Sequence, residues 1–353
     1  MGIMGRRDFL KLTGTAVIAV VIRPYAPLAT TLKSVPPEEP KLADPIGLGR
    51  VTNASIWAYD NPRPGATKLQ SLARDTVVEI YDITSTEGLL QHNPVWYLTA
   101  FGWVYSSWVQ PVRQQLNPVV RDVPQTGFWA QVSVPYVEMR SRPDEKSLLL
   151  YRLYYSSVYL IVAHVQDVLG QSWYQIRDNL APGQPEYVQA ENLRPIPPEE
   201  MAPISPDVED KLIKVNVQQQ MLYAYERGSL VFSTRCATGA AFNVENQGLV
   251  NFGTPHGKHQ MIRKSPSQHM IGGLGRSDYY DLPGVPFCAY FTASGVAVHG
   301  AYWHNDFGAQ RSHGCVNVMP EAAQWVYRWS QPAASYTDTD LQVTQGGTPV
   351  VVE

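Results

Sequence analysis

The chain has 353 residues, of which 44% are hydrophobic and 17% charged, and its formal net charge is −3. This length suits two or three domains with ample apolar material for their cores. A weakly negative charge excludes a chain built to neutralise a polyanion, so nucleic acid is not an expected partner. The 28 prolines, 26 glycines and 20 tyrosines favour turn-rich β-structure. We therefore expect a mainly β fold with one or few helices.

The N-terminus has the features of an export signal. Arg6 and Arg7 precede Phe9-Leu10-Lys11, and the apolar run 16–22 follows them. That run is short for a membrane-spanning helix and suits a signal segment. The pattern resembles a twin-arginine export signal, which we assign to residues 1–33 with cleavage near Ala29. The chain is then expected in the periplasm or on the cell-wall side of the cytoplasmic membrane, touching the membrane only through an uncleaved signal.

Two proline-rich stretches, 34–48 and 197–208, predict an extended spacer and a linker. Between them the same order of signals occurs twice, over 49–113 and 125–196. Each unit has a strand, a proline turn, a β-branched strand, a Trp-Tyr strand and an aromatic-Val strand. This pattern resembles tandem bacterial Src-homology-3-like modules, which are small β-barrels of exported cell-wall proteins. Their aromatic residues either fill the barrel cores or line a peptide- or glycan-binding groove.

From residue 209 the pattern changes, and we expect a third, β-rich domain over 209–353. A single helix is predicted to begin at Pro320, because proline suits a first helical position, and to carry the run 322–329. Alternating apolar residues predict a hairpin and further strands. The predicted strands are 212–217, 220–225, 230–234 and 348–352.

A cysteine and a histidine with adjacent glycines stand out in this third domain. Cys315 follows Gly314 within the sequence Ser-His-Gly-Cys-Val-Asn at 312–317, and His299 precedes Gly300 upstream. A glycine before a cysteine lets the backbone turn so that main-chain N–H groups can face a reacting carbonyl. A thiol with a pKa of ~8.5 is mostly protonated at neutral pH and needs a base. We assign Cys315 as a nucleophile and His299 as its base.

The order of these residues resembles the signature of the L,D-transpeptidases of bacterial cell-wall synthesis, and the resemblance covers about residues 209–352. Further segments match the same family. They are 220–225, Thr238-Gly239, Thr254-Pro255-His256-Gly257, Tyr280 with Val285-Pro286-Phe287, and Tyr302-Trp303-His304-Asn305-Asp306-Phe307-Gly308.

The resemblance implies an acyl transfer on peptidoglycan stem peptides. The Cys315 thiol would cut a tetrapeptide stem between its diamino acid and its terminal D-alanine, leaving a thioester. The Gly300 carbonyl would hold His299, and N–H groups around Gly314 and Cys315 would stabilise the oxyanion. An amine of a second stem then gives a 3→3 cross-link. Water as the acceptor would make the protein an L,D-carboxypeptidase, and a protein lysine would tether a wall-linked protein.

The resemblance also implies roles for residues around this pair, and it implies a carbapenem target. His313 joins the catalytic set in a structural or substrate-orienting role. Substrate contacts are expected from Ser312, Asn317, Tyr280, Tyr302 and Trp303. Ser312 and Asn317 are alternatively fixers of the loop, and each aromatic residue is alternatively part of the core. No cofactor or metal is expected, because thiol acyl transfer is complete with protein groups.

Three alternative hypotheses can be weighed against residues of the sequence. His299, His304, His313 and Cys315 offer zinc ligands, but no H-x-x-x-H or C-x-x-C spacing occurs. A papain-like protease would need a different sequence around its cysteine and its histidine on the other side. A non-catalytic wall-binding protein would have no chemical need for both His299 and Cys315. Cys236 and Cys288 either pair with each other or stay as buried thiols, and their strand-like contexts favour buried thiols.

Overall fold

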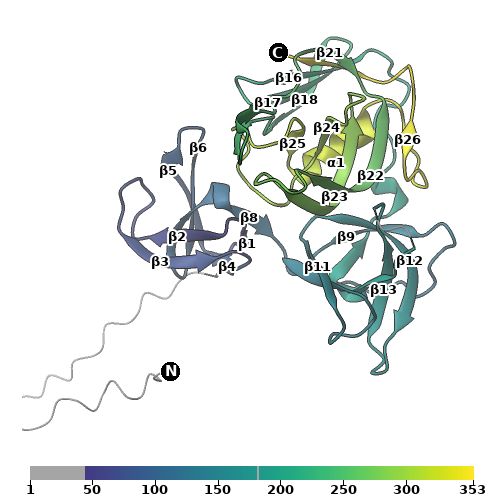
Figure 1. The fold of residues 1–353 in the computed structure, drawn as a ribbon, viewed down its shortest axis with the longest axis horizontal. Coiled ribbons are helices and arrows are strands. Elements are labelled where there is room, and N and C mark those ends of the chain that lie inside the picture. Colours follow the sequence, from purple (N-terminus) through teal and green to yellow (C-terminus); the bar gives the residue numbers. More distant parts are fainter. Residues whose placement is uncertain (1–43, 181–182) are drawn as a thin grey trace, which may run out of the picture. The chain divides into compact units, whose positions relative to one another are not determined.

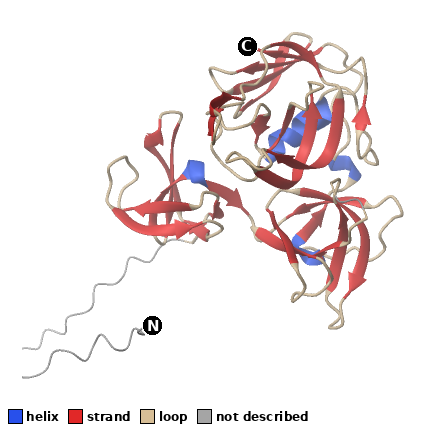
Figure 2. Ribbon diagram, in the orientation of Figure 1, coloured by secondary structure: helices blue, strands red, loops and turns tan. Residues whose placement is uncertain are grey.

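The structure of the chain is a computed structural model that describes residues 44–180 and 183–353. The predicted export signal at 1–33 and most of the predicted spacer at 34–48 lie outside the described residues. The described residues are mainly strand with a single α-helix, which confirms the expected fold class (Figure 2). None of the helices in these two ranges has the length and apolar character required to cross a membrane.

The first β-domain spans residues 47–112 and has two sheets, of strand order β4-β1-β8 and β3-β2-β7-β6-β5 (Figure 1). A 3-10 turn, η1 (Ser106–Trp108), leads from β7 into β8. The strands are β1 (Gly47–Val51), β2 (Ser55–Tyr59), β3 (Lys68–Ala73), β4 (Val77–Ile80), β5 (Asp82–Leu90), β6 (Asn93–Thr99), β7 (Gly102–Tyr105) and β8 (Val109–Val112).

The second β-domain spans residues 128–195 and forms one sheet of order β11-β10-β14-β13-β12-β9-β15. A 3-10 turn, η2 (Ala190–Asn192), leads from β14 into β15, and η3 (Pro198–Glu200) lies in the predicted linker. The strands are β9 (Phe128–Val132), β10 (Tyr136–Arg140), β11 (Leu149–Tyr154), β12 (Val158–Gln166), β13 (Ser172–Arg177), β14 (Glu186–Gln189) and β15 (Leu193–Pro195).

The two β-domains repeat one strand order. The run β3-β2-β7-β6-β5 of the first corresponds, strand for strand, to β11-β10-β14-β13-β12 of the second. The antiparallel pair β1–β8 corresponds to β9–β15, and a 3-10 turn precedes the last strand in both. The long strand β12 pairs with both β9 and β13, a task that β4 and β5 share in the first β-domain. The sequence duplication is therefore a duplication of topology.

The C-terminal domain begins with β16 and holds two five-stranded sheets and a separate hairpin. The sheets have the orders β18-β17-β16-β27-β21 and β25-β24-β23-β22-β26. The strands of the first are β16 (Lys211–Asn216), β17 (Met221–Glu226), β18 (Ser229–Arg235), β21 (Gly257–Gln260) and β27 (Pro349–Val352). Those of the second are β22 (Arg263–Gly272), β23 (Tyr280–Tyr290), β24 (Ala297–Gly300), β25 (Val316–Val318) and β26 (Leu341–Gln342). The hairpin is β19 (Ala241–Val244) with β20 (Gly248–Asn251).

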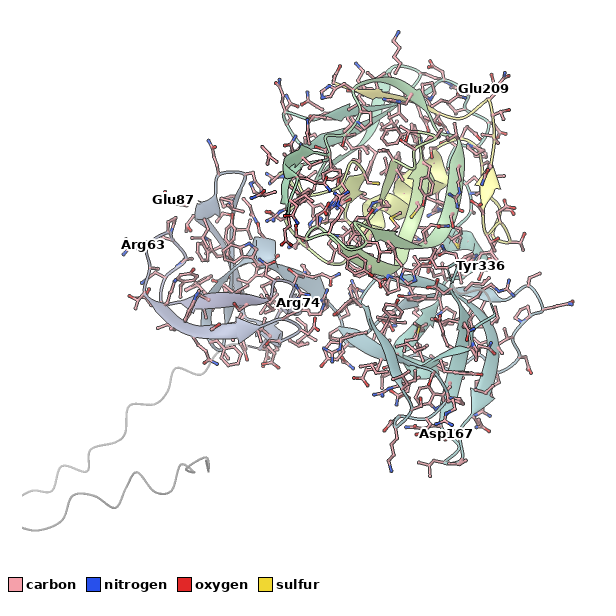
Figure 3. All side chains as sticks on the ribbon, viewed as in Figure 1. Arg63, Arg74, Glu87, Asp167, Glu209 and Tyr336 are labelled. Atoms are coloured by element: carbon pink, nitrogen blue, oxygen red, sulfur yellow. The ribbon has the colours of Figure 1, made fainter. Side chains whose placement is uncertain are left out.

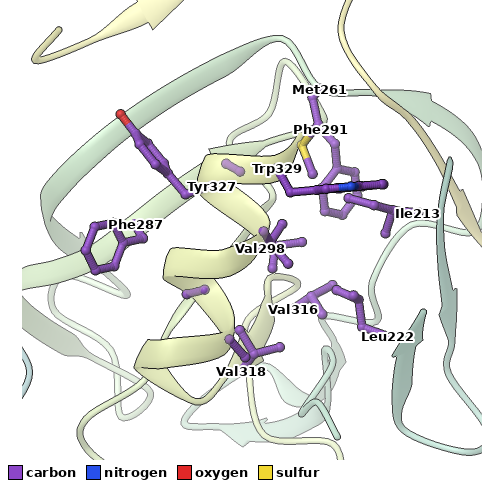
Figure 4. Packing of buried hydrophobic residues seen from close by; sticks show 14 of the residues in the cluster. Ile213, Leu222, Met261, Phe287, Phe291, Val298, Val316, Val318, Tyr327 and Trp329 are labelled. Carbon is purple, nitrogen blue, oxygen red and sulfur yellow. The ribbon is translucent and has the colours of Figure 1, made fainter. Parts of the chain in front are cut away.

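Helix α1 (Pro320–Trp329) and both of these sheets share one hydrophobic core. The predicted helix and the hairpin of β17 with β18 are confirmed, and Pro320 opens the helix as expected. Side chains of the helix meet Ile213 and Leu222 from one sheet and Phe287, Val298 and Val316 from the other (Figure 4). At most 1% of the surface of each of these five residues is exposed. The core thus fixes the spacing between the two sheets.

Two buried lysines hold the C-terminal end of α1. The Lys264 ammonium donates to the carbonyl oxygens of Tyr327 at 2.6 Å and Ser330 at 2.5 Å. The Lys211 ammonium donates to the Trp329 carbonyl at 2.7 Å. The last carbonyls of a helix lack intrahelical partners and carry partial negative charge, so cations suit this position. Burial, with the nearby Lys211, lowers the pKa of Lys264 to about 7.

Removing a core side chain of this domain should destabilise it strongly. Leu222 is fully buried, so Leu222→Ala should lower the free energy of unfolding by about 2–5 kcal/mol, through lost transfer energy and a residual cavity. Leu249 is 77% exposed, so Leu249→Ala should change it by no more than about 0.5 kcal/mol. Chemical denaturation of the full chain measures both. Equal losses in the two variants would contradict the described core.

Candidate active site

His299 and Cys315 lie on neighbouring parallel strands and on the same face of the sheet. Strand β24 pairs with β25 so that Val298 stands beside Val316 and His299 beside Asn317. Val298 and Val316 are fully buried in the domain core. Because side chains alternate between the two faces of a sheet, His299, Asn317 and the preceding Cys315 must point to the opposite face.

That opposite face opens into a cavity of about 190 Å³. Two of the ten residues predicted for the site are glycines, and seven of the other eight line this cavity. The predicted residues that line it are Tyr280, His299, Trp303, Ser312, His313, Cys315 and Asn317. Sequence reasoning did not predict the others, which are Phe242, Met270, Leu282 and Arg311.

His299 is fixed in one orientation by its own strand. Its Nδ1 lies 3.1 Å from the Gly300 carbonyl oxygen, the contact that the resemblance implies. Nδ1 therefore carries the proton and donates, which leaves Nε2 as the acceptor. A β-carbon added at Gly300 would lie 2.7 Å from Pro286 Cγ and 2.9 Å from Pro320 Cα, so only glycine fits there. Burial lowers the pKa of His299 to about 4, which keeps the imidazole neutral.

Cys315 rests as a protonated thiol. Burial raises its pKa to about 11, although a hydrogen bond from the backbone at Ala297 opposes part of that rise. The thiol donates to the Gly295 carbonyl oxygen, which lies 3.8 Å from Sγ. A thiol pKa of about 11 beside an imidazole pKa of about 4 makes the neutral pair, and not an ion pair, the resting state. His299 would then act as a general base during attack.

The turn before Cys315 is closed by the Ser312 hydroxyl. Its Oγ accepts from the Gly314 N–H at 3.1 Å and donates to the Cys315 carbonyl at 2.5 Å. Gly314 has a φ of +117°, a conformation that favours glycine. The Gly314 N–H is therefore occupied, and the Cys315 N–H is the group left for an oxyanion, since no hydrogen bond in the described part of the chain engages it. These hydrogen bonds fit the loop-fixing alternative for Ser312, which also lines the cavity.

Thr254 supports this turn from below, a role that sequence reasoning missed. Its hydroxyl is fully buried, accepts from the Gly239 N–H at 2.9 Å and donates to the Gly314 carbonyl at 2.8 Å. The residue before Gly239 also contacts the turn, because the Ser312 N–H donates to the Thr238 carbonyl at 3.1 Å. The segments that match the Thr-Gly and Thr-Pro-x-Gly turns therefore support the turn before Cys315. These two matches were the sequence signal from which the role of Thr254 could have been predicted.

His313 is held among aromatic rings and one carboxylate. Its imidazole stacks on Phe242 at 4.4 Å between ring centres and lies 5.0 Å from Tyr280. Its Nε2 lies 3.0 Å from Asp278 Oδ2, in the turn between β22 and β23. His313 thus ties the nucleophile turn to that turn and to the β19–β20 hairpin. This geometry agrees with the orienting role that the resemblance implies.

Asn317 contacts His304 across the floor of the site. Its side-chain amide lies 3.1 Å from His304 Nε2, while His304 Nδ1 accepts from the Asp306 N–H at 3.2 Å. Burial and the nearby Arg311 lower the pKa of His304 to about 3, so the ring is neutral and carries its one proton on Nε2. Asn317 must then present its amide oxygen to His304, because that proton needs an acceptor. The other amide atom is buried with no hydrogen-bond partner among the described residues.

Tyr302 corrects one expectation, because it does not line the cavity. The side chain is 1% exposed, and its hydroxyl donates to the Pro283 carbonyl at 2.6 Å. Its ring packs edge-on against Trp303 at 5.1 Å, so it supports the cavity wall and cannot reach a substrate. Cys236 and Cys288 are both buried free thiols, as the second of the two alternatives expected.

Residues 210–352 match the YkuD family model, described as an L,D-transpeptidase catalytic domain. A mutant L,D-transpeptidase from Enterococcus faecium is 21% identical, with 41% of this chain and 50% of that chain covered and a TM-score of 0.31. An L,D-transpeptidase from Mycobacterium smegmatis is 17% identical, with 79% and 100% covered and a TM-score of 0.32. Another from Xylanimonas cellulosilytica is 23% identical, with 40% and 60% covered and a TM-score of 0.28.

The family match covers residues 210–352, which is less than half of the chain, and the two β-domains lie outside it. The chain spans about half the length of the Enterococcus faecium protein. None of the curated proteins compared with the chain matches it.

The resting protonation state predicts how Cys315 reacts with a small neutral reagent. Because burial raises the thiol pKa to about 11, alkylation by iodoacetamide should speed up about tenfold per pH unit from pH 7 to pH 10, without a plateau. Stopped-time mass spectrometry measures the rate, and Cys315→Ala is the control because the other two thiols are buried. A plateau that begins near pH 6 would instead reveal a thiolate–imidazolium pair.

The Thr254 hydroxyl should matter for acylation more than its distance from Sγ suggests. Thr254→Val keeps the volume but loses both hydrogen bonds, so Gly314 shifts and acylation of Cys315 by a carbapenem should slow by about 10–100-fold. Thr254→Ser keeps the hydroxyl and should retain most of the rate. Acylation is followed by intact-protein mass spectrometry. Equal rates in the two variants would show that the hydroxyl does not position the turn.

Proposed function

We propose that the protein is an exported peptidoglycan L,D-transpeptidase. Cys315 attacks the bond between the diamino acid and the D-alanine of a tetrapeptide stem and forms a thioester acyl-enzyme. An amine of another stem peptide then takes the acyl group and gives a 3→3 cross-link. The observation that carries this proposal is the placement of His299 and Cys315 around one cavity, in a segment that matches an L,D-transpeptidase catalytic domain.

The chemistry needs only the groups of the site. As Sγ attacks the carbonyl carbon, its proton passes to His299 Nε2, and the Cys315 N–H donates to the oxyanion. The tetrahedral intermediate collapses, the C–N bond breaks, and Nε2–H gives its proton to the leaving D-alanine amine. The acceptor amine then attacks the thioester carbonyl, loses a proton to His299, and the C–S bond breaks to regenerate the thiol.

Several contacts support the assigned roles around this pair. The Gly300 carbonyl holds the tautomer that leaves Nε2 free, which is the task of a carboxylate in a catalytic triad. Ser312 and Thr254 fix the turn that presents the Cys315 N–H. Tyr280, Trp303 and the free amide atom of Asn317 face the cavity and serve as substrate contacts. His313 orients the turn through Phe242 and Asp278.

The two β-domains act as wall-directed modules of the Src-homology-3-like type in this proposal. Their common strand order supports two copies of one unit. The twin-arginine pattern at residues 1–33 supports delivery across the cytoplasmic membrane, where wall peptides are found.

The acyl-enzyme step is tested by mass. A carbapenem should add its mass to the wild-type chain, and Cys315→Ala should show no adduct. Of the three cysteines, which all lie in the described residues, Cys315 alone lines the cavity. His299→Gln should slow the addition by about 100-fold or more, since a positioned base contributes about 10²–10⁴-fold. Intact-protein mass spectrometry reads each variant. An unmodified wild type would exclude the proposed reaction.

The same enzyme incubated with disaccharide-tetrapeptides identifies the acceptor. Liquid chromatography with mass spectrometry should show 3→3 dimers and released D-alanine. Tripeptides without dimers would mean that water is the acceptor, and adducts on a wall protein would mean that a lysine is. Neither product, with an intact carbapenem adduct, would mean that the donor is not a tetrapeptide stem.

A further inference from the structure

A hollow of about 460 Å³ adjoins the active-site cavity and is walled by the first β-domain. Its lining consists of residues 52–55 and Arg74 of that domain and of Trp303, His304 and Arg311 of the C-terminal domain. Trp303 and Arg311 line the active-site cavity as well. The active-site cavity alone, at about 190 Å³, is below the usual size of ligand pockets, about 300–1,000 Å³. The hollow therefore extends the space that a substrate at Cys315 can occupy.

Hydrogen bonds hold the two walls of the hollow in place. The Asn305 side-chain amide donates to the carbonyls of Ser106 at 3.0 Å and Val109 at 3.1 Å. The Arg50 guanidinium donates to the Tyr302 carbonyl at 2.8 Å, and both side chains are buried. His92 Nε2 lies 2.6 Å from the buried Asp306 carboxylate. The loop between His299 and Cys315 is thus fastened to the first β-domain at three points.

The charge of the hollow is positive. Asp75 pairs with both Arg50 and Arg152, so its charge is more than balanced. Arg311 pairs with Asp306 through Nε and Nη2, which leaves Nη1 directed elsewhere. Arg74 is exposed, and no ion pair in residues 44–180 or 183–353 engages it. Two guanidinium groups with free donors therefore border the hollow, and guanidinium groups recognise planar carboxylates.

We propose that this hollow is a subsite for a free carboxylate of a peptidoglycan stem peptide, bound by Arg74 with help from Arg311. The proposal rests on the proposed function, because that function supplies a peptide that carries carboxylates. A stem that reaches from Cys315 past Trp303 enters the hollow without crossing the fold. The first β-domain is in this view part of the substrate site, in addition to any wall-binding role.

The test measures binding in the Cys315→Ala background, where no turnover occurs. The probes are a synthetic tetrapeptide stem with free carboxylates and the same peptide with its carboxylates amidated. Isothermal titration of the full chain should show about tenfold weaker binding of the free peptide for Arg74→Gln, and a smaller loss for Arg74→Lys, which keeps the charge but not the planar fork. Arg63→Gln is the matched control, because Arg63 is an exposed arginine toward the opposite end of the same domain (Figure 3).

The amidated peptide should bind wild type and Arg74→Gln equally. Arg74→Gln behaving like Arg63→Gln, or weakening both peptides alike, would overturn the subsite. With Cys315 restored, D-alanine release without an acceptor reports the donor, and added tripeptide reports the acceptor. A rise of about tenfold in the KM for the donor or for the acceptor in Arg74→Gln supports the subsite. The substrate whose KM rises is the one whose carboxylate the subsite binds. A chain that binds the free peptide through Arg74 but releases no D-alanine would overturn the proposed function and leave the subsite intact.

Discussion

The candidate site depends on one strand pairing, the parallel register of β24 with β25. Val298 and Val316 bury their side chains in the core shared with α1, and this burial fixes the register. A shift of β25 by one residue would bring Val316 out of the core and turn Cys315 and Asn317 toward it. Core packing therefore determines that His299 and Cys315 face one cavity. The pairing is parallel, so the chain must leave the sheet and return, and this excursion is the loop that carries Trp303 and Arg311.

The turn at Ser312 shows how the polar part of the site is satisfied. Two hydroxyl groups near Cys315 each make two hydrogen bonds and so connect two backbone groups. The Ser312 hydroxyl connects Gly314 to Cys315, and the Thr254 hydroxyl connects Gly239 to Gly314. Buried polar groups of this kind rigidify a site only when all are satisfied. The Cys315 N–H and one amide atom of Asn317 are the exceptions among the described residues of this turn, and both residues line the cavity.

Patterns local in the sequence predicted much of this architecture. What they missed depends on contacts between residues that lie far apart in the sequence. Helix α1 was predictable because Pro320 and the periodic run after it are local. His299 and Cys315 line one cavity, as their chemistry and the family resemblance of their motif led us to expect. The partnership of His313 with Asp278 joins residues 35 positions apart in sequence and has no local signature. Tyr302 and Trp303 are neighbours of similar type, and only the direction of the loop places one in the core and the other at the cavity.

The surroundings of His299 and Cys315 also affect the stability of the Cys315 thiol against oxidation. The low-dielectric surroundings disfavour both the thiolate and the imidazolium, so the pair stays neutral until a carbonyl is present to accept the charge. Oxidation of cysteine follows its thiolate character, so the raised pKa of the Cys315 thiol slows its oxidation. Cys236 and Cys288 are free thiols buried in the protein. The burial that raises the thiol pKa thus also slows spontaneous reactions of Cys315.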